Sequence, residues 1–379
     1  MERAGILSMQ RILNYGSFLQ AYSLKMVLEE LGWEVEFVDY HPGKCLVETS
    51  EKKGIQRRMQ KALEALRYRA SFRDKLRFIR YKKTYAEQYF PLLGIEKNHM
   101  NYAPRLDLLV IGSDEVFNCV QNNTNVGYSR ELFGYGNRAS KAVAYAASFG
   151  NTTLDKIEKY GIAETVRDDL SRLDCISVRD RNSQDIVRRL LGKEPPIYPD
   201  PVLLYDWGKY IPERKPMNEK YLLVYGYSGR FSAEECRCIT AFAGKHGLKI
   251  VSLGGIQNLR NTFMNCSPLE VPAWFANAEY VITDTFHGTV LSVVTHRRFA
   301  AFVREHGYGN SEKLGSLLEM LGLEDRKVTA SAELDEKIQD EIGYAEIDSL
   351  LAEWRGEAYG YLKNQTRQWS GQYAYNASN

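Results

Sequence analysis

The sequence predicts an α/β protein in which two Rossmann-like domains face each other across a cleft. Three observations predict this fold. The chain has 379 residues, more than the roughly 250–300 that one hydrophobic core supports. Short apolar strands alternate with helical patterns in both halves. A proline-marked crossing and a polar stretch separate the halves. We therefore expect domains at 1–205 and 221–345, a linker at 206–220, a C-terminal helix at 346–365 and a flexible tail at 366–379.

The first half opens with a strand, a turn, a helix and a second strand. Apolar residues 4–7 form the first strand, and residues 17–31 carry Leu, Tyr, Met and Val at helical spacing. Gly32 ends this helix, and a strand follows at 35–38. The alternation resumes with strands at 106–111, 143–146 and 175–178 and helices at 154–173 and 183–192. This order is typical of a doubly wound domain.

A basic segment interrupts the first half. Residues 52–83 contain 13 Lys and Arg but only two acids, Glu64 and Asp74, and their apolar residues recur at roughly helical spacing. We expect a basic helical insertion at about 52–100. It is either a solvated insertion or a surface for anionic lipid headgroups or an anionic substrate. Nucleic acid is a third option, but the segment lacks a binding motif.

The second half repeats the alternation. Strands are expected at 221–225, 249–253, 280–283 and 299–303, and helices at 232–246, 268–277, 288–296, 312–321 and about 347–363. Ligands of open α/β sheets bind at the carboxyl ends of the strands. Candidate site residues are therefore sought at those ends.

Composition and charge limit the class of protein. The chain is 44% hydrophobic and 26% charged, which excludes collagen-like, coiled-coil and wholly disordered proteins. Fifty Lys and Arg against 48 Asp and Glu leave a net charge of +2, so we expect no nucleic-acid partner. No apolar run reaches about 18 residues, and the six cysteines are scattered. The first residues lack the pattern of a signal peptide, so we expect none. We expect a reduced cytoplasmic protein, with peripheral attachment at the inner face of the cell membrane left open by the basic segment.

Four strand ends carry candidate site residues. Asn14 and Gly16 begin a helix whose N–H groups suit an anion, or simply form its cap. Gly112, Ser113 and Asp114 end a strand where the backbone approaches a ligand, or where a side chain caps the next helix.

The other two strand ends carry basic side chains. Arg179 and Arg181 offer planar forks for a carboxylate or phosphate, or form an interdomain salt bridge. His287 stands at a helix tip between Asp284 and Gly288, where an imidazole can act as a general acid or base. No metal-binding motif, dinucleotide fingerprint or Gly-x-Ser-x-Gly elbow occurs, so we expect no required metal or cofactor.

Together these motifs resemble the polysaccharide pyruvyl transferase family. The matching blocks, in order, are 14–22, 111–118, 145–150, 177–180, 199–202, 283–290 and 321–326. The resemblance covers about residues 4–365, outside the basic insertion. It implies a GT-B-like fold, phosphoenolpyruvate as donor, and a sugar of a cell-surface polysaccharide or its lipid-linked precursor as acceptor. The product is then a pyruvyl ketal, with phosphate released and no metal or redox cofactor.

The resemblance implies catalytic and donor-binding roles for Arg179 and His287. Further donor contacts are expected from Thr285, Gly288, Thr289 and Arg181. Strand-end position assigns Asn14, Gly16, Ser113 and Asp114 to the acceptor. Some family members have an arginine where this chain has Thr285, and Arg181, Arg297 and Arg298 are the candidate replacements.

Two alternative functions remain at this point. One is a nucleotide-sugar glycosyltransferase on the same scaffold, because a fold does not fix an activity. The other is a glycan-binding assembly protein without catalysis. Thr285, in place of the arginine of some family members, is consistent with such a loss of catalysis.

Overall fold

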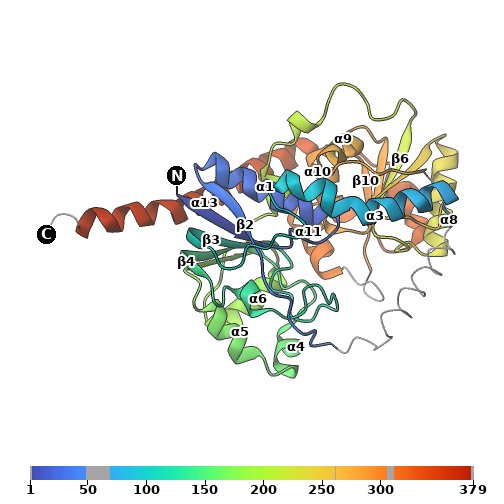
Figure 1. The fold of residues 1–379 in the computed structure, drawn as a ribbon. Helices are drawn as coiled ribbons and strands as arrows, with labels where there is room; N and C mark the ends of the chain where they lie inside the picture. The colour runs from blue at the N-terminus through green and yellow to red at the C-terminus, as the bar shows by residue number, and fades with distance from the viewer. Residues whose placement is uncertain (1, 48–68, 261, 305–310, 377–379) are drawn as a thin grey trace.

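Two parallel β-sheets form the centre of the molecule (Figure 1). The computed structural model describes residues 2–47, 69–260, 262–304 and 311–376. The first sheet contains β1 (Arg3–Leu7), β2 (Glu34–Val38), β3 (Arg105–Asp114), β4 (Arg138–Ala147) and β5 (Cys175–Val178). Its strand order is β2-β1-β3-β4-β5, and every pairing is parallel. The strand order reverses between β1 and β3, so a ligand site is expected beyond their carboxyl ends.

The second sheet has the strand order of a dinucleotide-binding Rossmann fold. Its strands are β6 (Tyr221–Tyr225), β7 (Lys249–Leu253), β8 (Thr262–Phe263), β9 (Tyr280–Thr283), β10 (Phe299–Phe302) and β11 (Lys327–Val328). They lie in the order β11-β10-β9-β6-β7-β8, which reverses between β6 and β9. The prediction of two Rossmann-like α/β domains is confirmed. The two-residue strands β8 and β11 were not predicted, because they are too short to show a hydrophobic pattern.

The helices connect the strands in the expected alternation. They are α1 (Tyr15–Glu30), α3 (Phe72–Leu93), α4 (Leu154–Lys159), α5 (Ala163–Leu170), α6 (Arg181–Leu191), α7 (Pro201–Leu204), α8 (Ala233–Lys245), α9 (Val271–Ala276), α10 (Phe286–Val294), α11 (Ser316–Met320), α12 (Leu334–Lys337) and α13 (Tyr344–Asn376). The single helix expected at 154–173 is divided into α4 and α5, because Gly161 has a φ of +66° that a helix cannot contain.

Three helices that begin near the gap between the sheets start with a side-chain cap. Asn14 accepts a hydrogen bond from Ser17 N at α1, and Asp180 caps α6 in the same way. Thr285 Oγ accepts a hydrogen bond from Gly288 N at the start of α10. Asp180 and Thr285 each stand two residues after a parallel strand, so the first turns of α6 and α10 are fixed relative to the strand ends.

The helices α1 and α3 join the two halves into one core. The hydroxyls of Tyr15 on α1 and Tyr89 on α3 both donate to the carbonyl of Cys266, each at 3.0 Å. The rings of Phe78 and Tyr81 pack on Phe263 of β8 at 5.4 and 5.9 Å. In Figure 1, α3 runs in front of the second half. The described part of the basic insertion, α3, therefore packs against the second half and is not fully surrounded by solvent. Its remaining residues, 48–68, lie outside the described residues.

The last helix, α13, connects the halves a second time. Near its start, the Tyr344 hydroxyl donates to the carbonyl of Arg297 at 2.6 Å. Further along, the Tyr361 hydroxyl donates to the carbonyl of Ala144 in β4 at 3.0 Å, and Leu362 is buried. The helix continues past the end expected near residue 365, to Asn376 (Figure 1). None of the described helices combines the length and apolarity needed to cross a bilayer.

Candidate active site

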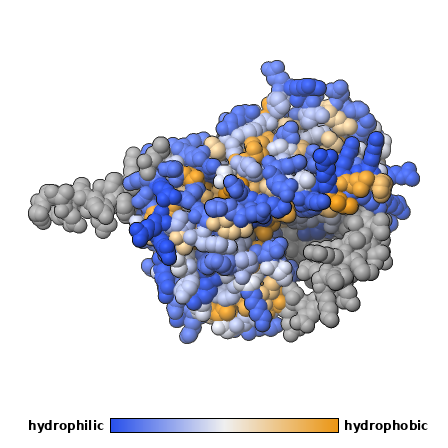
Figure 2. All heavy atoms as spheres, viewed as in Figure 1, coloured by the Kyte–Doolittle hydropathy of each residue, from blue (hydrophilic) through white to orange (hydrophobic). Residues whose placement is uncertain are grey.

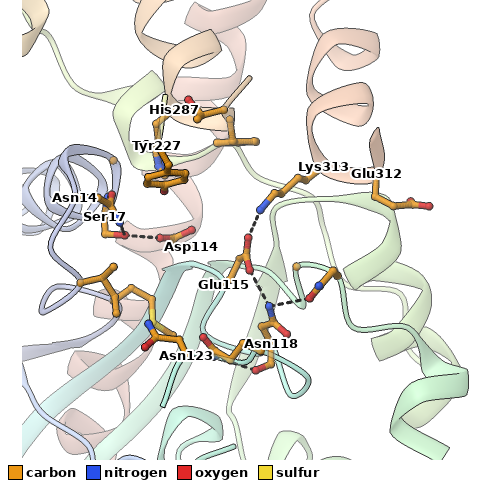
Figure 3. A pocket seen from close by; sticks show the side chains of 18 of the residues that line it. Asn14, Ser17, Asp114, Glu115, Asn118, Asn123, Tyr227, His287, Glu312 and Lys313 are labelled. Carbon is orange, nitrogen blue, oxygen red and sulfur yellow. Dashed lines mark hydrogen bonds and ion pairs between the residues drawn. The ribbon is translucent and has the colours of Figure 1, made fainter. Parts of the chain in front are cut away.

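A cavity of about 780 Å³ lies where the carboxyl ends of the two sheets face each other. Asn14 reaches it from the segment after β1 and Asp114 from the last position of β3, and Tyr227 and His287 reach it from the segments after β6 and β9. These are the strands between which each sheet reverses its order, so the cavity has the position expected of a ligand site in both sheets. Figure 3 shows His287 and Tyr227 on one side, facing Asp114 on the other.

Arg179 and His287 meet at a third residue, Asp200. Arg179 Nη1 lies 2.8 Å from Asp200 Oδ2, and His287 Nε2 lies 3.4 Å from the same oxygen. Arg179 follows β5 in the first half and His287 stands on α10 in the second. The structure therefore brings together the two side chains that the sequence singled out. The residue that joins them, Asp200, had been assigned no role.

Asp200 is buried and charged. Burial alone would raise the pKa of its carboxyl, but His287 and then Arg179 lower that pKa to about 2. Asp200 also accepts a hydrogen bond from Val202 N at 3.1 Å and so begins α7. The carboxylate is thus fixed by the backbone as well as by the two basic side chains.

Arg179 is held on several sides. Its side chain is only 3% exposed, Nη1 lies 3.5 Å from Asp114 Oδ1, and the guanidinium lies 4.2 Å from the centre of the Phe286 ring. Burial would lower the pKa of Arg179, but the nearby carboxylates of Asp114, Asp200 and Asp180 raise it overall. Arg179 lines the cavity with little exposed surface, so it contributes charge more than contact area.

The imidazole of His287 packs against the backbone of Gly16. A Cβ atom placed on Gly16 would lie 2.4 Å from His287 Nδ1, too close for any side chain. Gly16 is therefore required for the close approach of α1 to α10. Since Nε2 faces Asp200, the Nδ1 side of the ring lies beside Gly16, which lines the cavity.

The predicted acceptor residues separate into two groups. Asn14, Gly16 and Asp114 line the cavity, and Ser17 Oγ donates to Asp114 Oδ2 at 3.0 Å. Ser113 does not line it: its hydroxyl is fully buried and donates to the carbonyl of Ala146 at 2.8 Å. Ser113 therefore supports the cavity wall from behind, and an acceptor contact through its side chain has no basis in this geometry.

The predicted donor residues around His287 mostly shape its helix. Thr285 lines the cavity and caps α10, while Thr289 is buried and its hydroxyl donates to the carbonyl of Thr285 at 3.3 Å. Gly288 leaves room for the hydroxyl of Thr283, which would lie 2.1 Å from an added Cβ. Gly288 and Thr289 therefore position His287 within the fold and do not line the cavity.

The three arginines considered as replacements for a residue-285 arginine lie elsewhere. Arg181 is largely exposed and pairs with Glu319 of the second half at 3.0 Å, the interdomain salt bridge that the sequence left open. Arg297 and Arg298 follow the far end of α10, where Arg298 pairs with Glu341. These three arginines do not line the cavity.

Arg230 is a cavity cation that sequence reasoning missed. It follows β6, and its Nε lies 2.8 Å from Asp284 Oδ2. Asp284 is buried directly after β9, three residues before His287, and also pairs with Arg304 at 2.9 Å. Arg230 is thus fixed beside the segment that carries His287. The segment after β6 contains no motif that would have indicated it.

An ion pair crosses the cavity between Glu115 and Lys313 (Figure 3). Glu115 follows β3, and Lys313 precedes α11 in the second half. Burial would raise the pKa of Glu115, but Lys313, and then Asn118 at 2.8 Å, lower it to about 2. Both carboxylates that join the halves at the cavity, Glu115 and Asp200, are therefore ionised at neutral pH.

Amide side chains line the wall contributed by the first half. They are Asn14, Asn118, Gln121, Asn122, Asn123, Asn151 and Asn182. An amide both donates and accepts hydrogen bonds, which suits hydroxyl-bearing ligands. Four amide residues gather in 118–123, directly after the strand end at Asp114. This cluster could have indicated a wall for hydroxyl-bearing ligands from the sequence alone.

The charges lining the cavity are balanced. The cations Lys156, Arg179, Arg230 and Lys313 face the anions Asp114, Glu115, Asp284 and Glu312. An anionic ligand must therefore be held by directed contacts with individual cations. Among the described residues, no three His, Cys, Asp or Glu side chains gather as a metal site. The expectation that no metal or cofactor is required stays a prediction.

Comparison with known proteins identifies one family. The family model described as polysaccharide pyruvyl transferase matches residues 14–306, well over half of the chain. That range includes Arg179, Asp200, Arg230 and His287. No curated protein sequence matches the chain.

Solved structures that align with most of the chain share little sequence with it. The glycosyltransferase of kitacinnamycin is 9% identical, with a TM-score of 0.47 over 97% of this chain and 98% of that one. SnogD, a glycosyltransferase from Streptomyces nogalater, is 15% identical, with a TM-score of 0.42 over 94% and 95%. S. aureus MnaA, in a co-structure with UDP, is 10% identical, with a TM-score of 0.49 over 98% and 97%. These values support no inference about activity.

The ion pair between Glu115 and Lys313 predicts how stability falls in acid. The folded-state pKa of Glu115, about 2, is below the unfolded value of about 4.3, so its contribution is present above pH 4 and lost as pH falls towards 2. Glu115→Gln should reduce the free energy of unfolding at pH 7 by about 1–2 kcal/mol, after allowance for solvent screening. The substitution should also make the free energy of unfolding fall less steeply between about pH 5 and pH 2. Urea unfolding across this range measures both effects.

Glu319→Gln is the matched control, because its partner Arg181 is exposed and such pairs contribute little. An unchanged acid slope in the Glu115→Gln protein would show that the pair across the cavity does not stabilise the fold.

Proposed function

We infer the activity of this chain from one premise: it belongs to the polysaccharide pyruvyl transferase family. We propose that it moves the enolpyruvyl group of phosphoenolpyruvate onto two hydroxyls of one sugar in a cell-surface polysaccharide or its lipid-linked precursor. The product is a pyruvyl ketal, and phosphate is released. The observation that carries this proposal is the joining of Arg179 and His287, from opposite halves, by the buried carboxylate of Asp200 at the cavity.

The proposed reaction is a balanced group transfer with two proton movements. C2 of phosphoenolpyruvate forms two bonds to sugar oxygens; it loses its bond to the phosphate oxygen, and its double bond to the methylene carbon becomes a single bond. The two hydroxyls release two protons: the methylene carbon gains one and becomes a methyl group, and the departing phosphate gains the other. No oxidation occurs, so the protein must supply proton transfer and stabilisation of the phosphate.

His287 is the side chain best placed for proton transfer. Asp200 contacts its Nε2, and the Nδ1 side lies next to Gly16 at the cavity wall. A carboxylate behind an imidazole fixes the orientation of the ring and stabilises its protonated form. We assign the proton exchange with substrate to Nδ1 and the positioning of the ring to Asp200.

The donor's negative charges require individual cations. Arg179 brings one guanidinium to the cavity, although this group already pairs with Asp200 and Asp114. Arg230 is the second cation that we assign to the donor, because it lines the cavity on the side of His287 and is fixed by Asp284. It takes the place of the arginine that some family members carry at the position of Thr285. A guanidinium suits either the phosphate or the carboxylate of the donor.

The sugar acceptor is assigned to the wall of amide side chains. Asn118, Asn123 and their neighbours offer paired donors and acceptors to hydroxyl groups. Asp114 also lines the cavity, where its carboxylate accepts a hydrogen bond from Ser17 and lies 3.5 Å from Arg179 Nη1. The acceptor thus approaches the donor from the first half, opposite His287 (Figure 3).

Removing the imidazole should stop the reaction. We expect His287→Ala to lower phosphate release from phosphoenolpyruvate by about 10²–10⁴-fold in the presence of a suitable glycan, because general acid–base catalysis contributes that much. Asp200→Asn should also lower the rate, by up to about 10⁴-fold, and should change the pH profile, because the carboxylate both orients the ring and stabilises its protonated form. A phosphate-release assay measures the rates, and thermal unfolding checks that each variant is folded.

His296→Ala provides the matched control, because this histidine is exposed and pairs with Asp348 away from the cavity. Full activity of the His287→Ala protein would refute the assigned role. Stabilisation by UDP- or GDP-sugars, without any by phosphoenolpyruvate, would favour a nucleotide-sugar glycosyltransferase instead.

Loss of the Arg230 guanidinium should weaken donor binding. We expect Arg230→Ala to raise the KM for phosphoenolpyruvate by about 10–100-fold, the effect of one charge-assisted contact, with a smaller change in the KM for the acceptor. Arg230→Lys should recover part of the affinity. Arg298→Ala, at the far end of α10, is the control and should leave both KM values unchanged. Equal effects of the two alanine variants would remove Arg230 from the donor site.

A further inference from the structure

The first half of α3 exposes large apolar side chains on one stripe. Phe72, Leu76 and Ile79 are 76%, 50% and 57% exposed, the highest values among the exposed large hydrophobic residues described. Their spacing of four and three residues places them on one side of the helix. The opposite side carries Tyr81 and Tyr85, which are fully buried. The stripe therefore faces away from the core, and the fold does not need it.

Basic side chains border this stripe. Exposed Arg73, Arg77 and Arg80 each follow a stripe residue by one position, so they lie along one edge of it. Residues 72–83 contain six Lys and Arg but one acid, Asp74, which is buried, accepts a hydrogen bond from Ser71 Oγ at 2.6 Å and pairs with Arg77 Nη1 at 3.4 Å. Figure 2 shows an orange patch among blue side chains on the right-hand part of α3. The exposed charge along the stripe is thus almost entirely positive.

We propose that this face of α3 is a membrane-docking surface that lies in the headgroup region of an anionic bilayer. Phe72, Leu76 and Ile79 enter the boundary between headgroups and acyl chains, and Arg73, Arg77 and Arg80 contact anionic headgroups. An apolar stripe edged by cations is the pattern of helices that lie on membranes. A protein partner would have to present a matching acidic groove, whereas an anionic bilayer supplies both the negative charge and the apolar layer.

Helix α3 is hydrogen-bonded to the chain segment that borders the cavity. Lys82 Nζ donates to the carbonyl of Leu13 at 2.7 Å, and the Tyr85 hydroxyl donates to the carbonyl of Asn14 at 2.8 Å. Asn14 begins α1 and lines the cavity. A bilayer against α3 would therefore hold the acceptor side of the cavity in a fixed relation to the membrane surface. This step rests on the proposed function and favours a lipid-linked acceptor over a free glycan; the docking surface itself does not depend on it.

Vesicle binding by the full chain tests the proposal without any substrate. We expect cosedimentation with phosphatidylcholine vesicles that contain about one third phosphatidylglycerol, and binding that weakens as salt screens the charges. Phe72→Ser/Leu76→Ser/Ile79→Ser should reduce binding at least about tenfold, because the apolar contribution is lost. Arg73→Gln/Arg77→Gln/Arg80→Gln should abolish the preference for anionic over neutral vesicles.

Leu92→Ser is the matched control, because Leu92 is an exposed apolar residue at the other end of α3. It should bind vesicles like the unchanged protein. Equal binding to neutral vesicles, no binding at all, or normal binding by the triple serine variant would each overturn the proposal. So would a triple serine variant that loses self-association in sedimentation without lipid, since the stripe would then be a protein interface. Phosphate release from a soluble acceptor should be unchanged in these variants, which separates this test from that of the proposed function.

Discussion

One buried carboxylate oxygen, Oδ2 of Asp200, determines how the two halves meet at the cavity. It lies 2.8 Å from the Arg179 guanidinium and 3.4 Å from the His287 imidazole, which come from opposite halves of the molecule. A carboxylate in this position would be strongly disfavoured without partners, because burial penalises its charge. Its two basic neighbours are what make the buried position tolerable. The same contact places the imidazole against Gly16. The contacts that join the two halves therefore also fix the geometry of the site.

The shared core limits how far the cavity can open. Tyr15 and Tyr89 donate to the carbonyl of Cys266 across the halves, and Glu115 pairs with Lys313 across the cavity. A rigid-body opening would break these buried hydrogen bonds as well as the partly buried ion pair, and lost buried bonds cost more. The cavity is therefore largely preformed. Because its positive and negative side chains balance, a ligand must be bound by directed contacts, and a preformed cavity holds the contacting side chains in place.

The sequence could predict the architecture and the two central side chains, because both follow from local rules. Apolar runs mark the parallel strands, and strand ends are where ligands bind, which selects Arg179 and His287. It could not predict Asp200 as their common partner, because that contact depends on how the chain turns after the proline-rich crossing. Strand-end position alone could not separate Arg179 from Arg181, two residues further on. Tertiary packing buries the first at the cavity and pairs the second with Glu319. Ser113 illustrates the same limit, since a strand-end hydroxyl can point behind the wall.

The path of α13 has a consequence for how the protein is made. Tyr361 and Leu362 complete the packing of the first half, with the Tyr361 hydroxyl bonded to the carbonyl of Ala144 in a central strand of that half. Those residues are synthesised more than two hundred positions after Ala144. Chains emerge from the ribosome at roughly 5–20 residues per second, so the nascent first half spends on the order of ten seconds or more with this surface uncovered. During translation the first half is therefore an incomplete folding unit until α13 has been synthesised, and its uncovered apolar surface is exposed to aggregation in that interval.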